Sequence, residues 1–217
     1  MFIKICGISL EEDYGFLLER NISAVGFIAY PRSPRYVGPG KLARILGSRE
    51  NNPSIKKVAV FVNSAFEEIM EYVRCGIDVV QLHGGESPDI AVRLSEYAEV
   101  WKAVRPRSED EIRKYASFPA GKFLIDAFSE KLKGGTGKPA DWKLARLAVE
   151  TYSQPVILAG GLKPENVYEA VKAVKPYGID VSSGVEASPG VKNFSAIDTL
   201  LENARKAFEE IKESGRS

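Results

Sequence analysis

The sequence contains a single histidine, His83, and only two cysteines, Cys6 and Cys75. A metal site built from two histidines of one chain is therefore excluded, and a catalytic triad that depends on histidine has little support. Two cysteines do not make a disulfide framework, so we expect a reducing, cytoplasmic setting.

Long apolar runs and a charge excess are also missing. No apolar run approaches the roughly 18 residues that a membrane-spanning helix needs. We expect no signal peptide, because the first predicted strand already begins at Phe2. Thirty Lys and Arg residues against 29 Asp and Glu give a net charge of +1, so neither a nucleic-acid partner nor an acidic membrane surface is indicated.

Short apolar runs alternate with segments of helical spacing along the whole chain. The helical segments repeat apolar residues at i, i+3 and i+4, as in residues 66–73, 167–174 and 197–211. The runs are nearly continuous in hydrophobicity, which is typical of parallel strands covered by helices. Eight runs follow this pattern: residues 2–6, 24–29, 57–62, 79–83, 100–104, 122–126, 155–159 and 179–183.

Eight strands alternating with helical segments predict an α/β fold, a (β/α)₈ or TIM barrel, with residues 1–217 as a single domain. An open, doubly wound sheet would show the same alternation and is the alternative. The count of eight, and the lack of a linker or composition shift, favour the barrel. In such barrels the active site lies at the C-terminal ends of the strands, so polar residues at those ends are the candidates.

Cys6 ends the first predicted strand. Ser9 and Glu12 are spaced like an N-cap and its capping-box partner, so a helix is expected to begin there. The N-terminus of that helix would favour the Cys6 thiolate, and Lys4, on the same face of the strand, would add positive potential. The alternative is a small buried apolar residue, and that packing role is our prediction for Cys75.

Asp126 closes the apolar run KFLID. Desolvation at the end of a buried strand would raise the pKa of this carboxyl group and let it act as a general acid near neutral pH. The alternative is a structural carboxylate that is satisfied by hydrogen bonds. Together, an acid at Asp126 and a thiolate base at Cys6 would form a proton-transfer pair across one pocket.

Two glycine-containing turns follow the last two predicted strands. One contains Gly160 and Gly161 before a helix that Pro164 is expected to open, and the other reads Ser182-Ser183-Gly184. Glycines permit close approach of the backbone, and the loops after strands seven and eight are the usual phosphate site of these barrels. Tight turns without a ligand are the alternative. The pattern predicts a phosphorylated small-molecule substrate.

Two other loops carry candidate binding features. In YPRSPRYVGPG, residues 30–40, prolines stiffen the segment around Arg35, which could pair with a carboxylate or phosphate or simply be solvated. The glycine-rich segment 128–142 is long for a strand-to-helix connection and is expected to close over a ligand. It contains a G-x-G-x-x-A match that we reject as a dinucleotide fingerprint, because it lies far beyond the strand and includes Pro139.

The chain carries, in order, the motifs KICGI, GFIAYPRSPRYV, VFVN, VQLHG, GGTG before DW, LAGGL-PENV and DVSSGVE-SPG. Together with the residues above, these motifs resemble the phosphoribosylanthranilate isomerase family of tryptophan biosynthesis. The resemblance runs nearly end to end, and the ordered set is far more specific than any single motif. Two positions depart from the usual family pattern: Ala140 stands where many members carry an aromatic residue, and Asn193 stands where an aspartate is common and is expected to cap a helix.

The resemblance implies an Amadori rearrangement of N-(5-phosphoribosyl)anthranilate to 1-(2-carboxyphenylamino)-1-deoxyribulose 5-phosphate. It implies no metal and no redox cofactor. Asp126 would be the general acid and Cys6 the general base, while Arg35 would hold the anthranilate carboxylate. The turns at Gly160–Gly161 and Ser182–Gly184 would bind the phosphate, and His83 and Asp180 would have supporting roles. The sequence does not choose between a monomer and a homodimer.

Three other functions stay open at this point. A phosphosugar isomerase of histidine synthesis on the same barrel resembles a two-aspartate design, which Cys6 disfavours. A cysteine-nucleophile enzyme would form a covalent intermediate at Cys6. A barrel that only binds a phosphoribosyl ligand would show no turnover, and the presence of both Cys6 and Asp126 argues against it.

Overall fold

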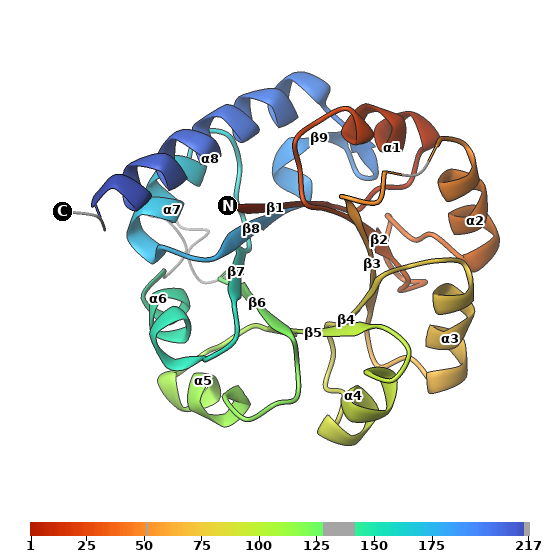
Figure 1. Cartoon of the computed structure of the whole chain (residues 1–217), viewed down its shortest axis with the longest axis horizontal. Coiled ribbons are helices and arrows are strands. Elements are labelled where there is room, and N and C mark those ends of the chain that lie inside the picture. Colours follow the sequence, from red (N-terminus) through yellow and green to blue (C-terminus); the bar gives the residue numbers. More distant parts are fainter. Residues whose placement is uncertain (51, 128–141, 215–217) are drawn as a thin grey trace.

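The computed structural model describes residues 1–50, 52–127 and 142–214, and they form a closed barrel of parallel strands in the order β1 to β8 (Figure 1). The barrel prediction is confirmed, and the open doubly wound sheet is wrong because β1 pairs with both β2 and β8. The strands are β1 Phe2–Cys6, β2 Ala24–Ile28, β3 Lys56–Phe61, β4 Val79–Leu82, β5 Glu99–Val104, β6 Lys122–Asp126, β7 Val156–Ala159 and β8 Gly178–Val181.

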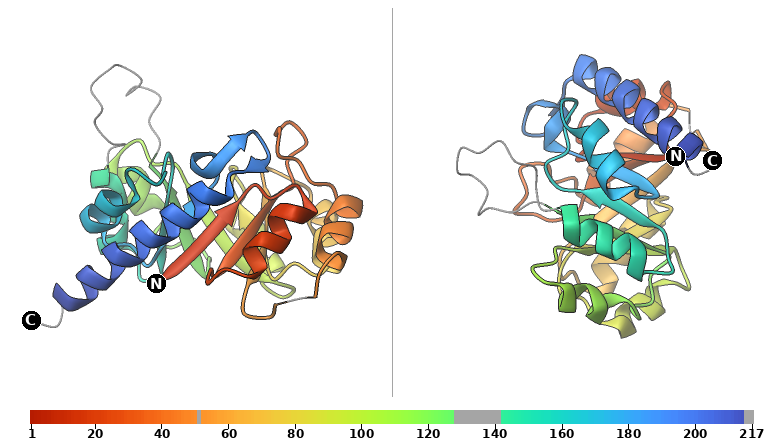
Figure 2. Two further views of the ribbon diagram at one scale, coloured as in Figure 1. Left: turned by 90° about the horizontal axis from the view of Figure 1, so that it is seen from above. Right: turned by 90° about the vertical axis from the view of Figure 1, so that its left-hand side faces the viewer.

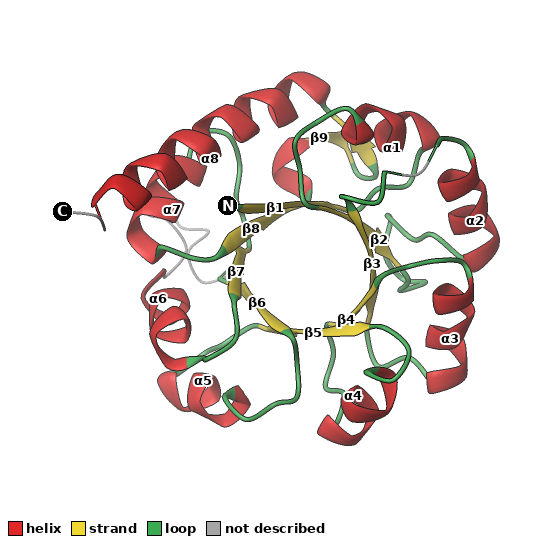
Figure 3. Cartoon of the chain, in the orientation of Figure 1, coloured by secondary structure: helices red, strands yellow, loops and turns green. Residues whose placement is uncertain are grey.

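Helices surround the strands on the outside of the barrel (Figure 3). None of the described helices is both long enough and apolar enough to cross a membrane. The three apolar stripes expected from the sequence lie on α3, α7 and α8, whose apolar faces pack on the main core cluster. The helices are α1 Glu11–Leu18, α2 Pro39–Gly47, α3 Phe66–Arg74, α4 Pro88–Leu94, α5 Glu109–Tyr115, α6 Trp142–Thr151, α7 Val167–Val174 and α8 Phe194–Ser214.

Each strand divides its side chains between two cores, because successive residues point to opposite faces. The larger core lies between strands and helices and includes Ile3 and Ile5 of β1. On the same strand, Phe2 belongs to a second cluster made of alternate strand residues, which fills the inside of the barrel. Lys4 and Cys6 share the inward face with Phe2, so β1 carries a lysine and a cysteine toward the barrel axis. The second cluster comprises Phe2, Ala24, Val58, Val79, Trp101, Ala103, Leu124, Ile157 and Ala159.

Two predicted helix starts are wrong. Helix α1 begins at Glu11 after Leu10, which provides no side-chain cap. Ser9 is not the N-cap, because its hydroxyl donates a 2.7 Å hydrogen bond to the carbonyl oxygen of Gly190. Helix α7 begins at Val167 rather than at Pro164.

Two smaller predictions about single residues are confirmed. The side-chain oxygen of Asn193 accepts a hydrogen bond from the backbone N–H of Ala196 at 3.0 Å, as an N-cap of α8 should. Cys75 follows α3 as its C-terminal cap residue and packs, partly buried, against the main core. Its thiol lies 3.6 Å from the carbonyl oxygen of Pro39, which fits a packing role.

A short antiparallel hairpin after β8 was not predicted. It consists of β9 Glu186–Ser188 and β10 Val191–Lys192, joined through Gly190, whose φ of 84° is in the left-handed region. Figure 2 shows the hairpin, in blue, beyond the end of the barrel toward which the arrow of β1 points. The hairpin therefore stands beside the predicted active-site end, where Glu186 and Lys192 become important.

The opposite end of the barrel is held by a carboxylate that joins three strands. Glu99 at the start of β5 accepts hydrogen bonds from Lys56 at 2.5 Å, Lys122 at 2.6 Å and Trp101 Nε1 at 2.7 Å. Burial alone would raise the pKa of Glu99, but these three hydrogen bonds and the lysine charges outweigh it and lower the pKa to about 2. Its charged form is therefore strongly favoured in the folded state.

Replacing this carboxylate by an amide, Glu99→Gln, is expected to lower the free energy of unfolding at pH 7 by about 2 kcal/mol. The pKa is depressed in the folded state, so the stabilisation is present above about pH 4.5 and is lost as the pH falls toward 2. Urea unfolding at pH 7 and near pH 3 would measure the difference. The exposed Glu96 is the control: Glu96→Gln should have little effect, and equal effects of the two variants would contradict the prediction.

Candidate active site

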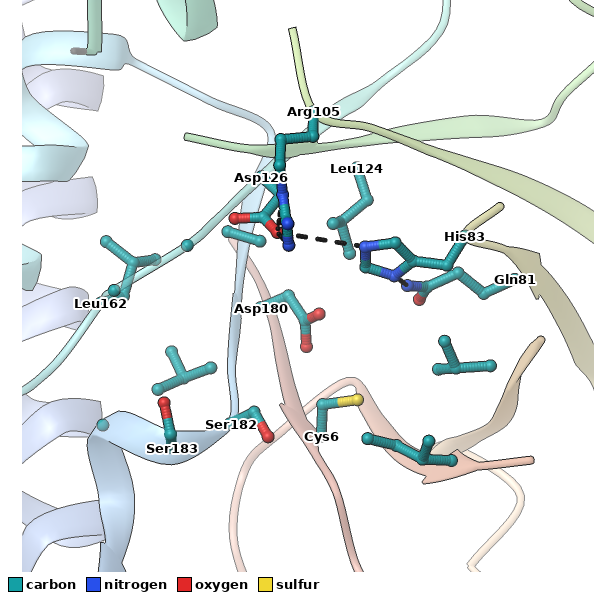
Figure 4. A pocket seen from close by; sticks show the side chains of 17 residues that line it. Cys6, Gln81, His83, Arg105, Leu124, Asp126, Leu162, Asp180, Ser182 and Ser183 are labelled. Carbon is teal, nitrogen blue, oxygen red and sulfur yellow. Dashed lines mark hydrogen bonds and ion pairs between the residues drawn. The ribbon is translucent and has the colours of Figure 1, made fainter. Parts of the chain in front are cut away.

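A cavity of about 320 Å³ opens at the C-terminal ends of the strands (Figure 4). Nine of the ten predicted site residues line it; Arg35 is not in the lining. The lining also includes residues that the sequence did not single out, among them Gln81. The full lining is Cys6, Ile28, Val60, Gln81, His83, Arg105, Leu124, Asp126, Ala159, Gly160, Gly161, Leu162, Asp180, Val181, Ser182, Ser183 and Gly184.

Cys6 lies at the floor of this cavity and is 5% exposed. Burial raises the pKa of the Cys6 thiol; the Lys4 ammonium lowers it again in part, and Asp180 raises it. Activation by a helix N-terminus stays a prediction, with α1 beginning at Glu11, while the predicted contribution of Lys4 is present, since its ammonium lowers the pKa of the thiol. The charge that favours the thiolate most is therefore the Lys4 ammonium inside the barrel.

Asp126 faces the cavity from the end of β6 and is held by Arg105 from the end of β5. Arg105 donates to Asp126 Oδ2 from Nε at 3.0 Å and from NH2 at 2.5 Å. His83 Nε2 lies 4.0 Å from the same oxygen, which is longer than a hydrogen bond. Three neighbouring strand ends thus place a carboxylate, a guanidinium and an imidazole on one wall of the pocket, as Figure 4 shows.

His83, directly after β4, is oriented by Gln81, which lies two residues earlier on that strand. The two side chains lie 3.3 Å apart, between Gln81 Nε2 and His83 Nδ1. With Gln81 Nε2 as the donor, Nδ1 of a neutral imidazole accepts, and the ring hydrogen is then on Nε2, the side that faces Asp126. Among the described residues, Gln81 Oε1 is buried and has no hydrogen-bond partner.

The protonation of His83 can be measured without ambiguity, because it is the only histidine. Burial lowers the pKa of His83, and the charge of Asp126 raises it only in part. The NMR titration of the imidazole is therefore expected to have a midpoint below the ordinary value of about 6.5. Asp126→Asn should lower the midpoint further, since it removes the charge that raises it.

The lowered pKa of His83 also makes the free energy of unfolding depend on pH. Unfolded His83 binds its proton more readily than folded His83, so this residue lowers the free energy of unfolding as the pH falls from about 6.5 toward the folded-state pKa. A midpoint at or above 6.5 would contradict the prediction and would mean that an imidazolium is paired with Asp126.

Two loops on the other side of the pocket pack backbone against backbone. Gly160 and Gly161 have φ values of 92° and 67°, in the left-handed region that glycine adopts without strain. A Cβ atom at Gly184 would lie 1.9 Å from the carbonyl oxygen of Leu162, so only glycine fits between the two loops. Ser183 begins a short 3₁₀ turn, η2 Ser183–Val185. The predicted phosphate-binding turns therefore form one continuous wall.

Comparison with known proteins identifies the family. A family model described as N-(5'phosphoribosyl)anthranilate (PRA) isomerase matches residues 3–203.

The chain belongs to this family.

The relatives match over almost their whole length. An N-(5'-phosphoribosyl)anthranilate isomerase of Trichlorobacter lovleyi is 40% identical over 207 residues, which cover 95% of this chain and 98% of the relative. The crystal structure of phosphoribosyl anthranilate isomerase from Thermotoga maritima has a TM-score of 0.84 at 37% identity, covering 95% of this chain and 99% of that one.

A further family structure contains a bound molecule. This phosphoribosyl anthranilate isomerase, in complex with reduced 1-(o-carboxyphenylamino)-1-deoxyribulose 5-phosphate, has a TM-score of 0.82 at 36% identity and covers 95% of this chain and 99% of its own. The family and the enzyme class, an isomerase, were both predicted from the sequence and are confirmed.

Arg35, the residue that the family resemblance assigns to a carboxylate, lies beside the cavity. Its side chain crosses Gly7, where a Cβ atom would be 2.8 Å from Arg35 Cδ. Its guanidinium pairs with Glu186, from Nε to Oε1 at 2.7 Å and from NH2 to Oε2 at 2.5 Å. Arg35 is thus held next to the strand end that carries Cys6, with one edge of the guanidinium used by a carboxylate of the protein itself.

Lys192, in the hairpin that was not predicted, connects three parts of the site by hydrogen bonds. Its buried ammonium donates to the carbonyl oxygens of Cys6 at 2.6 Å and Ser182 at 3.2 Å, and to Glu186 Oε1 at 2.9 Å. The motif SPG-V-K contains this lysine, and the alternation in VVQLH places Gln81 on the face of His83, so signals for both residues were present. They were missed because neither residue stands at the end of a predicted strand.

The last features concern the segment predicted to close over a ligand and the binding of metal ions. The predicted closing segment 128–142 and the departure at Ala140 lie outside the described residues, except for Trp142 at the start of α6. In the described part of the chain, no group of three His, Cys, Asp or Glu side chains is placed to hold a metal ion.

Proposed function

We propose that this chain converts N-(5-phosphoribosyl)anthranilate to 1-(2-carboxyphenylamino)-1-deoxyribulose 5-phosphate, a step of tryptophan synthesis. The observation that carries the proposal is that Cys6 and Asp126 line one cavity, whose other wall is made by the glycine-rich loops. The reaction moves hydrogen within one molecule, so it needs a proton donor and a proton acceptor. Family membership supports the choice of substrate.

The chemistry begins at Asp126. Its carboxyl group gives a proton to the ring oxygen of the ribose as the ring opens, which stabilises the leaving alkoxide. Arg105 holds the carboxyl group against the wall through two hydrogen bonds to one oxygen. His83, kept neutral by burial, directs Nε2–H toward the same group and limits where it can lie.

Cys6 then removes the proton from the neighbouring sugar carbon. The thiolate is a suitable base because it is compact and is placed at the floor of the cavity beside Lys4 and Asp180. The resulting enolamine tautomerises to the ketose. Thiolate base and carboxylic acid reach the sugar from different strands, which allows both proton transfers without movement of the barrel.

The two ends of the substrate carry negative charge, and the chain offers a partner for each. The phosphate binds the backbone of Gly160, Gly161 and the turn Ser182–Gly184, while Asp180, which also lines the cavity, has a supporting role. Arg35 binds the anthranilate carboxylate through the edge of its guanidinium that Glu186 does not use. Positive potential at both ends would align the ribose with the acid and the base.

A thiolate base at Cys6 also bears on the compartment in which the protein works. A base at Cys6 must be a free thiol, and both cysteines are free in the structure, which supports a reducing cytoplasm. The proposed mechanism uses residues of one chain and applies to a monomer or a homodimer. One solved relative consists of monomers generated from a dimeric phosphoribosylanthranilate isomerase of Thermotoga maritima.

Turnover of phosphoribosylanthranilate, generated in place, tests the proposal directly. Purified protein is expected to form the ketose product without added metal or redox cofactor. A protein that binds the compound but does not convert it would overturn the proposal and leave only a phosphoribosyl-binding barrel.

A further inference from the structure

Lys4 is a fully buried lysine inside the barrel. Its side chain is 0% exposed, and its ammonium lies 3.0 Å from each carboxylate oxygen of Asp180, which is on β8. A charged lysine is rarely buried unless it is paired, because desolvation of the ammonium is costly. The buried pair lies inside the barrel beside the active-site cavity, which Asp180 and the neighbouring Cys6 both line.

The neighbouring strand is shaped to let Lys4 and Cys6 lie together. Gly26 on β2 has no side chain, and a Cβ atom there would be 2.6 Å from Cys6 Sγ and 3.0 Å from Lys4 Cε. Both side chains therefore occupy the space above one glycine. A residue larger than glycine would force the thiol, the lysine or both away from this position.

Several charged side chains surround Cys6. Asp180 faces it from β8, Lys192 from the hairpin and Arg35 from the loop after β2, while Lys4 is on its own strand. Lys192 and Arg35 share Glu186, so much of their charge is already balanced. The charges of Lys4 and Asp180 also act on His83, directly after β4, whose pKa is lowered mainly by burial. A thiolate at Cys6 would add a second negative charge beside Asp180, with Lys4 as their shared cation.

We propose that Lys4 is a positioning residue for the isomerisation, whose ammonium is the shared counter-charge that keeps both the Cys6 thiolate and the Asp180 carboxylate inside the barrel. This inference rests on the proposed function, in which Cys6 is the base. Lys4 keeps its own proton throughout, and the proton from the sugar carbon goes to the Cys6 sulfur. Gly26 completes the arrangement by leaving room for both side chains.

The pH dependence of thiol alkylation tests this role without substrate. Iodoacetamide reacts with the thiolate, and peptide mass spectrometry separates Cys6 from Cys75, which serves as a reference within the same molecule. Lys4→Met is expected to raise the midpoint for Cys6 by about one to three pH units, the usual effect of one nearby opposite charge. The alkylation rate at pH 8 should then fall about tenfold or more, while Cys75 is unchanged.

Two further variants distinguish an effect of charge on Cys6 from an effect of altered packing around it. Asp180→Asn removes a negative neighbour and should lower the midpoint for Cys6, the opposite direction from Lys4→Met. Lys4→Arg keeps the charge and should restore part of the thiol reactivity. The plateau rate at high pH reports access to the thiol, so a packing change that only opens or closes the cavity alters the plateau and not the midpoint.

The outcomes also separate this inference from the proposed function. If wild type turns over and Lys4→Met leaves both the midpoint and kcat unchanged, Lys4 has no such role and the function stands. If wild type is inert but the midpoints shift as stated, the charge arrangement stands and the function fails. If Lys4→Met does not fold, Asp180→Asn decides alone: an unchanged or raised midpoint overturns the inference.

Discussion

Cys6→Ser is expected to reduce kcat by about 10²- to 10⁴-fold, the range over which a single acid or base contributes to catalysis. Serine is nearly the same size as cysteine, so the cavity and the contact with Gly26 are preserved and substrate binding should survive. The hydroxyl is a far weaker acid than the thiol. It cannot be present as an anion beside Asp180, even with Lys4 nearby.

Cys75→Ser is the matched control. Cys75 is the other free cysteine, but it caps α3 and packs on the main core, away from the residues that line the cavity. Its replacement should leave kcat unchanged. Turnover and the binding of reduced 1-(o-carboxyphenylamino)-1-deoxyribulose 5-phosphate are the two measurements, and near-normal turnover of Cys6→Ser would remove this residue from the mechanism.

Mass spectrometry of the wild-type protein decides between a base and a nucleophile at Cys6. A nucleophile forms a covalent adduct with the substrate, so mass spectrometry of wild type during turnover would show a stoichiometric mass increase on the peptide that contains Cys6. The general-base mechanism predicts no such adduct. Detection of one would favour the cysteine-nucleophile alternative over the isomerase chemistry proposed for this pocket.

The strands and the ends of the strands could be predicted because both follow from local pattern. A parallel strand covered on both sides must be apolar along its length, so KVAVFV and KFLID are visible in the sequence alone. The barrel rule then brings Cys6, His83 and Asp126 to one end of the molecule. No distance between these residues was needed for that step, which is why it succeeded.

Pairings between distant strands could not be predicted. Lys4 and Asp180 are 176 residues apart, and only the closure of β1 against β8 brings them within 3.0 Å. The pairing of Glu186 with Arg35 depends on a hairpin of two very short strands, which have no periodic pattern to detect. The supposed cap at Ser9 failed for a similar reason, since its hydroxyl is used by Gly190 from the same hairpin.

Asp126→Asn is expected to reduce kcat by a similar factor, about 10²- to 10⁴-fold, for a different chemical reason. The amide has almost the shape of the carboxyl group, and its oxygen can still accept hydrogen bonds from Arg105. It has no acidic proton to give to the ring oxygen. The ribose would therefore stay closed, although the phosphate loops and Arg35 would still bind the substrate.

Asp198→Asn is the control for the loss of an arginine–carboxylate pair. Asp198 lies on α8, half exposed, and pairs with Arg20 at 3.2 Å on the outside of the barrel. Surface ion pairs of this kind contribute little to the free energy of unfolding, so the fold and the turnover should be unchanged. If Asp126→Asn also turned over at nearly the wild-type rate, the proton for ring opening would have to come from another group, and Asp126 would only hold Arg105 against the pocket wall.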